Sequence, residues 1–272
     1  MSTIRSILVH VDAGPHSAAR LQCARQLGGQ LGATVTALYA VTPVYVELAL
    51  NVAAGGASDV LMAIDEQRLA TARRLVADVN AGPGLQIEWQ QARDAPEYAF
   101  IQQALYADLL VVGQHDRLQR DTGVLPDFVP SVVIASGKPA LVVPYIGMPS
   151  SLDTVFVAWK ETPQAAHALS AALPLLRTAS AVHIGIDAAL SSESKAALQG
   201  FLLRHSVVDP QLHTLVATAP DAGALMLSMA ADVDADLMVM GCYGHSRARE
   251  LVLGGASRSV LSSMTLPVLM AH

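Results

Sequence analysis

An internal repeat constrains the fold of this chain more than any other feature. The segment Asp108-Leu-Leu-Val-Val-Gly113 recurs as Asp236-Leu-Met-Val-Met-Gly241, at an offset of 128 residues. The same offset places Pro139 on Pro267 without a gap. Near the front of each half, a second apolar segment also recurs at a somewhat larger offset. The repeat therefore predicts two domains of similar fold in tandem.

Short apolar segments alternate with amphipathic ones in each half. In the first half, strands are predicted at 7–12, 34–41, 85–89, 109–112 and 139–143. Helices are predicted to begin near residue 15 and to cover 62–79, 96–106 and 128–135. Uninterrupted apolar strands are typical of sheets that are buried on both faces. The alternation therefore predicts an α/β fold with a parallel sheet flanked by helices in each domain.

The first domain is predicted to cover residues 1–147 and the second residues 151–272, with a Gly- and Pro-containing linker between them. The offset between the halves falls by about 20 residues after the second strand. The first half carries additional sequence there, and we interpret residues 42–60 as an inserted loop.

Each half ends in an apolar strand, at 140–143 and 268–271. An apolar strand at the edge of a sheet is a site of aggregation unless something covers it. We therefore expect these two strands to lie side by side and antiparallel. The two domains would then pack as an intramolecular pseudo-dimer related by a two-fold axis.

A glycine-rich loop follows the fourth predicted strand of the second half. Gly241 and Gly244 bracket a turn, and Gly254-Gly255 precede a predicted helix at 256–264. Glycines let the backbone approach a ligand closely, and a helix N-terminus attracts phosphate. Three arginines lie close by in the sequence, namely Arg247, Arg249 and Arg258. The loop predicts phosphate binding, although each glycine taken alone is equally consistent with a purely structural turn.

The spacing Gly241-x2-Gly244-x9-Gly254 resembles the nucleotide-binding signature of the universal stress protein family. The order of strands and helices resembles a tandem member of that family over essentially the whole chain. The resemblance implies two doubly wound, five-stranded domains with a site where the first and fourth strands diverge. In the second half, this places Trp159 and Lys160 opposite the glycine loop. Lys160 replaces an acid that is common in the family, and Gly255 replaces a Ser or Thr.

The resemblance implies a stress-response protein that binds ATP, with Mg, or a related adenine nucleotide in its C-terminal domain. The predicted binding residues are Trp159, Lys160, Gly241, Gly244, His245, Arg247, Gly254, Gly255, Ala256 and Ser257. No catalytic residue, metal ligand or covalent cofactor is predicted, so ATP hydrolysis would at most be slow. An alternative from a different class is an interaction scaffold that stabilises partners without nucleotide.

The first half has lost the glycine signature. Asp116, Pro126 and Asp127 stand at positions where the second half has glycines. Carboxylates repel phosphate, and proline has no N–H group to donate. The first half does retain Asp12, at the position where the resemblance implies an acid near the adenine side of the site. We therefore expect one nucleotide per chain, bound in the second half.

The composition argues against several other classes of protein. The chain is 52% hydrophobic, yet no apolar run approaches the ~20 residues of a membrane span. The net charge of −6 is unfavourable for a general nucleic-acid binder. Two cysteines, Cys23 and Cys242, fit a reducing compartment, and we interpret Cys242 as a quiet small side chain. We expect a cytoplasmic protein with no membrane or nucleic-acid partner, and homodimerisation is left open.

Motifs of other nucleotide sites and of common enzymes are missing from the sequence. It contains no serine-hydrolase elbow, no P-loop, no Cys/His cluster with metal spacing and no dinucleotide fingerprint after the first strand. His10 and His183 lie within predicted strands, and we interpret them as core or edge residues.

Overall fold

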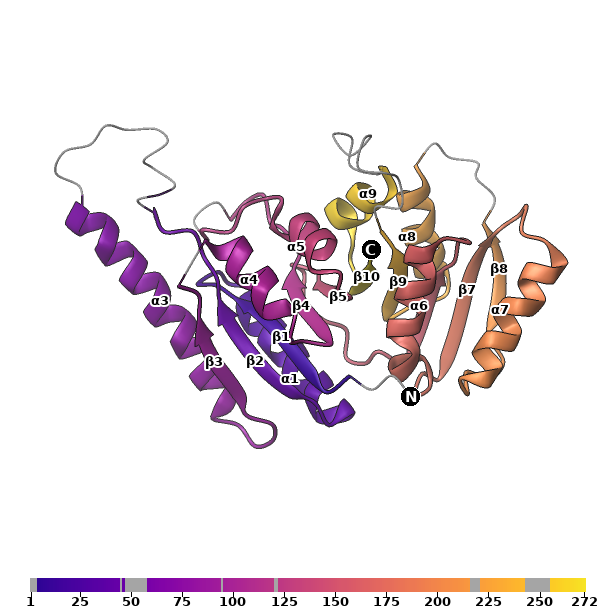
Figure 1. The fold of residues 1–272 in the computed structure, drawn as a ribbon, viewed down its shortest axis with the longest axis horizontal. Coiled ribbons are helices and arrows are strands. Elements are labelled where there is room, and N and C mark those ends of the chain that lie inside the picture. Colours follow the sequence, from indigo (N-terminus) through magenta and orange to yellow (C-terminus); the bar gives the residue numbers. More distant parts are fainter. Residues whose placement is uncertain are drawn as a thin grey trace. The chain divides into compact units, whose positions relative to one another are not determined.

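The structure is a computed structural model, and it describes residues 4–44, 46, 58–93, 95–119, 122–215, 221–242 and 255–272. By its contacts the chain divides into two compact units, Ile4–Lys138 and Pro139–His272. Each unit is an α/β structure, as the sequence predicts, and each is described separately below (Figure 1).

The first unit contains a sheet with strands in the order β3-β2-β1-β4, and all of its pairings are parallel. Helices α1 and α3 pack together, and so do α4 and α5, on opposite faces of this sheet (Figure 1). The elements are β1 (Ser6–Val11), α1 (Ser17–Leu31), β2 (Thr34–Tyr39), α3 (Ser58–Asn80), β3 (Ile87–Gln91), α4 (Pro96–Ala104), β4 (Leu109–Gly113) and α5 (Phe128–Ser136).

The second unit contains strands in the order β5-β10-β9-β6-β7-β8, and the last five of these are parallel to one another. Helices α8 and α9 pack together, while α6 covers β9 and β10. The elements are β5 (Ala140–Val143), β6 (Thr154–Ala158), α6 (Pro163–Leu176), β7 (Ala181–Asp187), α7 (Ser192–Arg204), β8 (Gln211–Leu215), α8 (Ala222–Asp232), β9 (Leu237–Gly241), α9 (Gly255–Ser263) and β10 (Val268–Ala271).

The repeated aspartates have the same structural role in both units. Asp108 accepts hydrogen bonds from the backbone N–H groups of Arg5 and Ser6, at 2.8 and 3.0 Å. Asp236 accepts one from the N–H of Thr154 at 3.1 Å. Asp108 therefore ties the start of β1 to the start of β4, and Asp236 ties the start of β6 to the start of β9. The sequence repeat thus corresponds to a repeated tertiary contact.

The expected pairing of the two apolar strands is confirmed. β5 and β10 are antiparallel neighbours, with Val142 opposite Val268 and Leu141 opposite Leu269. Every residue of both strands is buried. By its contacts β5 groups with the second unit, although its sequence closes the first predicted domain. The β10 edge is therefore covered by a strand of the same chain, as the argument from exposed edges requires.

The predicted loop at 42–60 extends too far, because α3 already begins at Ser58. Helix α3 has 23 residues and its counterpart α7 has 13, so the additional sequence of the first half lies partly in a longer helix. Strand β3 also begins two residues later than predicted, at Ile87. Helix and strand boundaries of this kind depend on tertiary contacts that periodicity does not encode.

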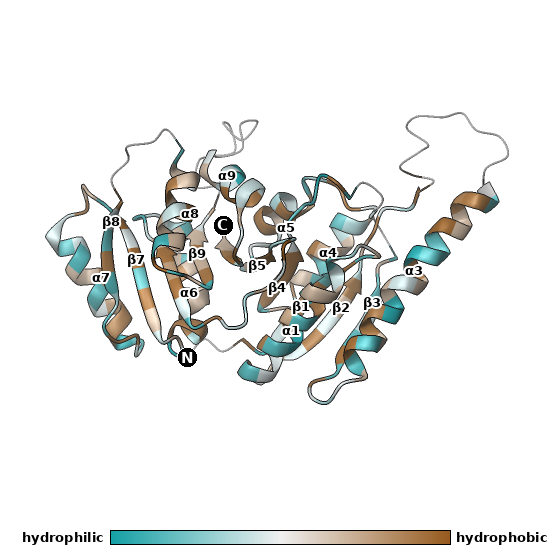
Figure 2. Cartoon of the chain, turned by 180° about the vertical axis from the view of Figure 1, so that it is seen from behind, coloured by the Kyte–Doolittle hydropathy of each residue, from teal (hydrophilic) through white to brown (hydrophobic). Residues whose placement is uncertain are grey.

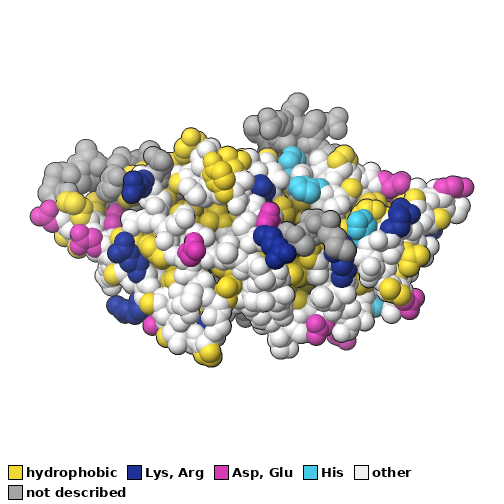
Figure 3. Space-filling view, turned by 60° about the horizontal axis from the view of Figure 1, so that its bottom comes forward, with side chains coloured by type: hydrophobic (Ala, Val, Ile, Leu, Met, Phe, Trp, Pro, Cys, Tyr) yellow, Lys and Arg dark blue, Asp and Glu magenta, His cyan; other side chains and the backbone are white. Residues whose placement is uncertain are grey.

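The apolar residues follow the two sheets. Strands β4 and β9 each bury their four apolar residues, and Figure 2 shows the central strands as hydrophobic and much of α7 as polar. On the face drawn in Figure 3, Lys and Arg side chains are scattered among acidic and apolar ones. None of the helices that the structure describes is long and apolar enough to cross a membrane.

Candidate nucleotide site

A cleft of about 340 Å³ lies at the carboxyl ends of β6, β7 and β9 in the second unit. It brings together six of the ten predicted site residues, namely Trp159, Lys160, Gly241, Gly255, Ala256 and Ser257. The other four, Gly244, His245, Arg247 and Gly254, lie outside the described residues. The cleft is therefore where the rule for doubly wound sheets places a ligand, outside the strand ends at the switch point.

Gly241 shapes the floor of the cleft through a close backbone contact. A Cβ atom at this position would lie 2.6 Å from the backbone carbon of Gln164 and would also collide with the backbone of Ala165. Both belong to the first turn of α6, where the Thr162 side chain accepts a hydrogen bond from the N–H of Ala165. The absence of a side chain at Gly241 is thus required by packing between β9 and α6.

The first turn of α9 forms another wall of the cleft, and α8 holds it in place. Asp221 caps α8 and also accepts a 2.6 Å hydrogen bond from the Ser259 hydroxyl in α9. This bond to Ser259, together with bonds from backbone N–H groups of α8, lowers the pKa of Asp221. A Cβ atom on Gly223 would lie 2.7 Å from the Ala256 carbonyl oxygen, so the two helices approach closely. The N-terminus of α9 is consequently fixed toward the cleft.

Gly255 differs from Gly241 because no atom of the described residues lies within 4 Å of the Cβ that a larger residue would add there. Its backbone also does not adopt the left-handed conformation that favours glycine. The structure therefore leaves room for a side chain at the first residue of α9. A helix N-terminus of this kind, with its positive dipole end at a cleft, suits a phosphate group.

The cleft contains further residues that the sequence did not single out. Leu215, Leu225 and Met226 give the cleft an apolar wall, and the aromatic residue Trp159 also lines it. The Nε1 atom of Trp159 is buried and has no hydrogen-bond partner among the described residues. An apolar wall and an aromatic ring together suit a flat, largely apolar base.

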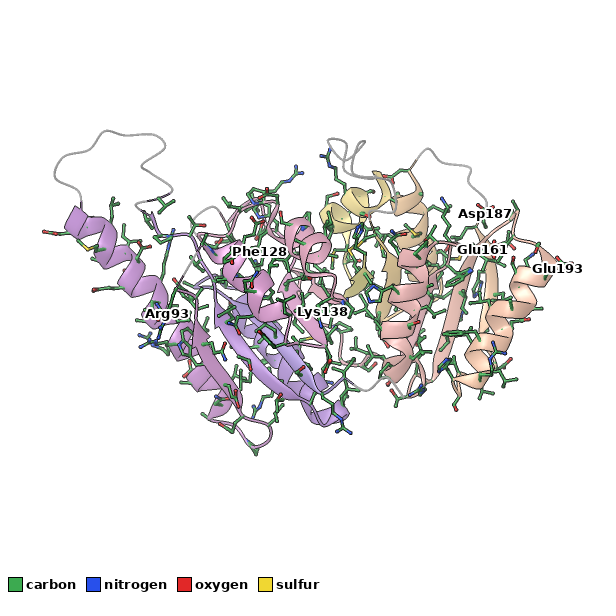
Figure 4. All side chains as sticks on the ribbon, viewed as in Figure 1. Arg93, Phe128, Lys138, Glu161, Asp187 and Glu193 are labelled. Atoms are coloured by element: carbon green, nitrogen blue, oxygen red, sulfur yellow. The ribbon has the colours of Figure 1, made fainter. Side chains whose placement is uncertain are left out.

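Asp187, at the end of β7, contributes a carboxylate to the same cleft. One of its oxygens accepts a hydrogen bond from the N–H of Ala189 at 2.8 Å. Figure 4 shows Asp187 and Glu161 at the same edge of the sheet. In doubly wound nucleotide sites, an acid at the end of the second strand binds ribose hydroxyls. Its position directly after the apolar run 184–186 was a signal that could have identified it.

The corresponding crevice of the first unit is filled by its own side chains. The cavity there measures only about 40 Å³, far below the roughly 300–1,000 Å³ of small-molecule sites. Arg20 forms a buried ion pair with Asp12 and lies 2.6 Å from the Ser17 hydroxyl. Asp12 also accepts hydrogen bonds from Ser17 and from the N–H of Gly14. The Arg20 side chain covers Gly113, the counterpart of Gly241.

This cluster changes the role that the resemblance implies for Asp12. Burial is the largest influence and raises the pKa of Asp12. The Arg20 guanidinium, His10 and the hydrogen bonds from Gly14 and Arg20 together outweigh burial and hold this pKa below its usual range. The carboxylate is ionised and already partnered, so it does not face a ligand. Asp116, which replaces a glycine of the signature, pairs with His16 at 3.1 Å. Arg20 was not predicted, since nothing in its helical spacing distinguishes it from a surface residue.

The cysteine and histidine interpretations are confirmed. Burial raises the pKa of Cys242 to about 12, so this thiol is not a reactive thiolate. His10 is in the core, with its ring 4.5 Å from that of Phe128. His183 lies within β7, and its Nδ1 is 2.9 Å from Nε2 of His213 on the edge strand β8.

The fold and the cleft define the chain as a tandem, doubly wound α/β protein with a crevice at the carboxyl edge of its second sheet. The sequence model of the universal stress protein family matches residues 3–144 and 160–272. The chain therefore belongs to the universal stress protein family, whose members are stress-response proteins. Both halves match, so the tandem arrangement predicted from the repeat is confirmed.

Solved structures support the same fold. A universal stress protein from Archaeoglobus fulgidus DSM 4304 superposes with a TM-score of 0.73 at 16% identity, covering 99% of this chain and 96% of that one. A functionally unknown protein from Pseudomonas aeruginosa PAO1 gives a TM-score of 0.60 at 14% identity, covering 98% and 92%. No curated protein matches the sequence. At these identities the structural likeness establishes the fold alone.

Among the described residues, no group of three or more His, Cys, Asp or Glu side chains is arranged to hold a metal ion. The charged side chains that line the cleft in the described part of the second unit are Lys160 and Asp187. This arrangement can bind a ligand with an apolar base, hydroxyl groups and a phosphate. It does not by itself present a nucleophile with an adjacent general base.

Proposed function

We propose that the second unit binds ATP or a related adenine nucleotide in the cleft at the carboxyl ends of β6, β7 and β9. The observation that carries the proposal is the convergence of an apolar wall, the Trp159 ring and the N-terminus of α9 on one cleft. Each element suits a different part of a nucleotide. The wall and ring suit the base, Asp187 suits the ribose, and the helix N-terminus suits a phosphate.

Lys160 is exposed at the end of β6, where it can reach a phosphate oxygen with its ammonium group. Mg would enter with the nucleotide, because the described residues offer no metal cluster of their own. Free, buried cysteines and the net charge of −6 support a reducing, cytoplasmic setting for this function.

Tryptophan fluorescence tests the location of the site. The chain has two tryptophans, Trp89 in the first unit and Trp159 in the cleft. We expect Mg-ATP to change the emission of the wild type and of Trp89→Phe by the same amount. Trp159→Phe should lose this change while circular dichroism remains unaltered. A change that depends on Trp89 instead would place the nucleotide in the first unit and contradict the proposal.

The first unit supports the alternative hypothesis, an interaction scaffold that stabilises partners without nucleotide. The crevice filled by Arg20 leaves about 40 Å³, which is too small for a nucleotide. If Mg-ATP at millimolar concentration left both tryptophans unaffected and bound nowhere, a nucleotide-independent interaction role would become the better account of the whole chain.

A further inference from the structure

The first unit contains a second cavity, next to the crevice that Arg20 fills. It measures about 420 Å³ and lies between the end of β2, the start of α4 and the segment 123–128. Val124, Leu125 and Phe128 contribute to the walls of both spaces. Figure 4 marks Arg93 and Phe128, which line this cavity. Its volume is in the range of small-molecule sites, whereas the adjacent crevice is not.

The walls of this cavity are largely apolar. They are formed mainly by Ala40, Pro43, Val124, Leu125 and Phe128. Phe128 is buried and fixed by edge-on packing against Phe100, with ring centroids 5.4 Å apart. Gly123 lies at φ 68°, a conformation that favours glycine, and its carbonyl oxygen accepts a 2.8 Å hydrogen bond from the N–H of Thr42. The walls are therefore pre-formed.

Glu97 adds a carboxylate to the otherwise largely apolar lining of this cavity. It lies in the first turn of α4, at the positive end of the helix dipole. Its Oε1 atom is buried and has no hydrogen-bond partner among the described residues. A buried carboxylate oxygen without a donor is costly, and its carboxyl group can rotate to accept one. The Oε1 atom of Glu97 therefore lacks a hydrogen-bond donor, and a ligand with an N–H group can supply one.

We propose that this cavity binds an apolar molecule carrying an amine, with the ammonium group donating a hydrogen bond to Glu97. The carboxylates of Glu97 and Asp116 disfavour phosphates in this unit, so the ligand is of a different class from a nucleotide. The apolar walls would hold the ligand's hydrocarbon part. The proposal is independent of nucleotide binding in the second unit.

Arg93 also lines the cavity, but from an exposed position. Solvent and salt screen its charge, whereas the Glu97 oxygen is shielded from both. The pairing with Glu97 therefore outweighs the repulsion from Arg93. Arg93→Ala is accordingly expected to leave amine binding unchanged or to tighten it slightly.

Titration calorimetry of the full chain with three indole probes tests the proposal. Tryptamine carries the amine, 3-methylindole is neutral, and indole-3-propanoate carries the opposite charge. We expect tryptamine to bind most tightly and to bind equally well when the protein is saturated with Mg-ATP. Glu97→Gln keeps the shape but removes the charge, and should weaken tryptamine roughly 10- to 100-fold.

Two further variants complete the test. Glu88→Gln removes an exposed acid from β3 in the same unit and should leave binding unchanged. Ala95→Phe places a ring in the cavity from its rim and should weaken all three probes while circular dichroism stays the same. The proposal is overturned by no tryptamine binding at millimolar concentration, by equal binding of tryptamine and 3-methylindole, by an unaffected Glu97→Gln variant, or by displacement with ATP.

Discussion

Gly255 is the residue at which the nucleotide cleft departs most informatively from the family signature. The open space beside it shows that a side chain can be added without a collision. We predict that Gly255→Ser tightens ATP binding roughly 3- to 30-fold, or about 0.7–2 kcal/mol, because a hydroxyl can donate to a phosphate oxygen. Titration calorimetry with Mg-ATP measures the effect. Weaker binding by this variant would contradict the placement of phosphate at the start of α9.

His10 is the residue that should make the first unit sensitive to acid. Burial, followed by the charge of Arg20, lowers the pKa of His10 from 6.5 to about 4. The unfolded chain therefore takes up this proton at a higher pH than the folded chain does. The contribution of His10 to the free energy of unfolding is fully present above pH 6.5. This contribution should fall by up to about 3 kcal/mol as the pH drops toward 4.

His10→Gln provides the matched comparison for this pH dependence. Glutamine stays neutral over the whole range and can still donate a hydrogen bond to the Ala40 carbonyl, as Nε2 of His10 does at 2.8 Å. Urea unfolding between pH 7 and 4 should show a shallower decline in the variant than in the wild type. Identical declines would mean that His10 is not the group responsible.

At the scale of elements, the contact between β9 and α6 fixes the floor of the cleft. Gly241→Ala would push a methyl group into the backbone of the first turn of α6. We predict a loss of about 1–3 kcal/mol in the free energy of unfolding, as for other overpacked sites. Gly255→Ala is the control, because its methyl group meets none of the described residues and alanine favours helix by up to ~1 kcal/mol. Equal unfolding midpoints for the two variants would refute this account.

The elements also show how far the sequence could be interpreted. Periodicity and the repeat predicted the strand order along the chain and the pairing of β5 with β10, because buried strands need continuous apolar runs. They missed the start of α3 at Ser58, because the predicted helix began only at the later apolar residue Met62, although Ser58 and Asp59 are residue types that favour helix starts.

The candidate site was predictable to a similar degree. Glycine spacing identified Gly241, and Gly255 was noted as a departure from the signature. Their different surroundings depend on neighbours that are distant in sequence. The sequence also did not predict that the Arg20 side chain fills the crevice of the first unit. An arginine facing the core is recognised only once its partner Asp12 is seen across the fold. The apolar wall around Leu225 likewise becomes part of the site only through tertiary proximity.

On the scale of the whole molecule, the two units have diverged from one sequence repeat in opposite ways. The second retains an open cleft of about 340 Å³ with a helix N-terminus at its wall. The first closes its crevice around the pair of Arg20 and Asp12 and opens an apolar cavity beside it. The two units therefore differ in the space at the carboxyl ends of their strands, although they come from one sequence repeat.

The central claim, one nucleotide per chain in the second unit, is tested most directly by the stoichiometry of Mg-ATP binding in calorimetry. We predict a single site in the wild type and none in Gly255→Asp, which copies Asp127 of the first half. This substitution places a carboxylate where phosphate would lie, while an acid at a helix start stabilises α9, so lost binding cannot be ascribed to unfolding. Two equivalent sites, or unchanged binding by Gly255→Asp, would contradict the account.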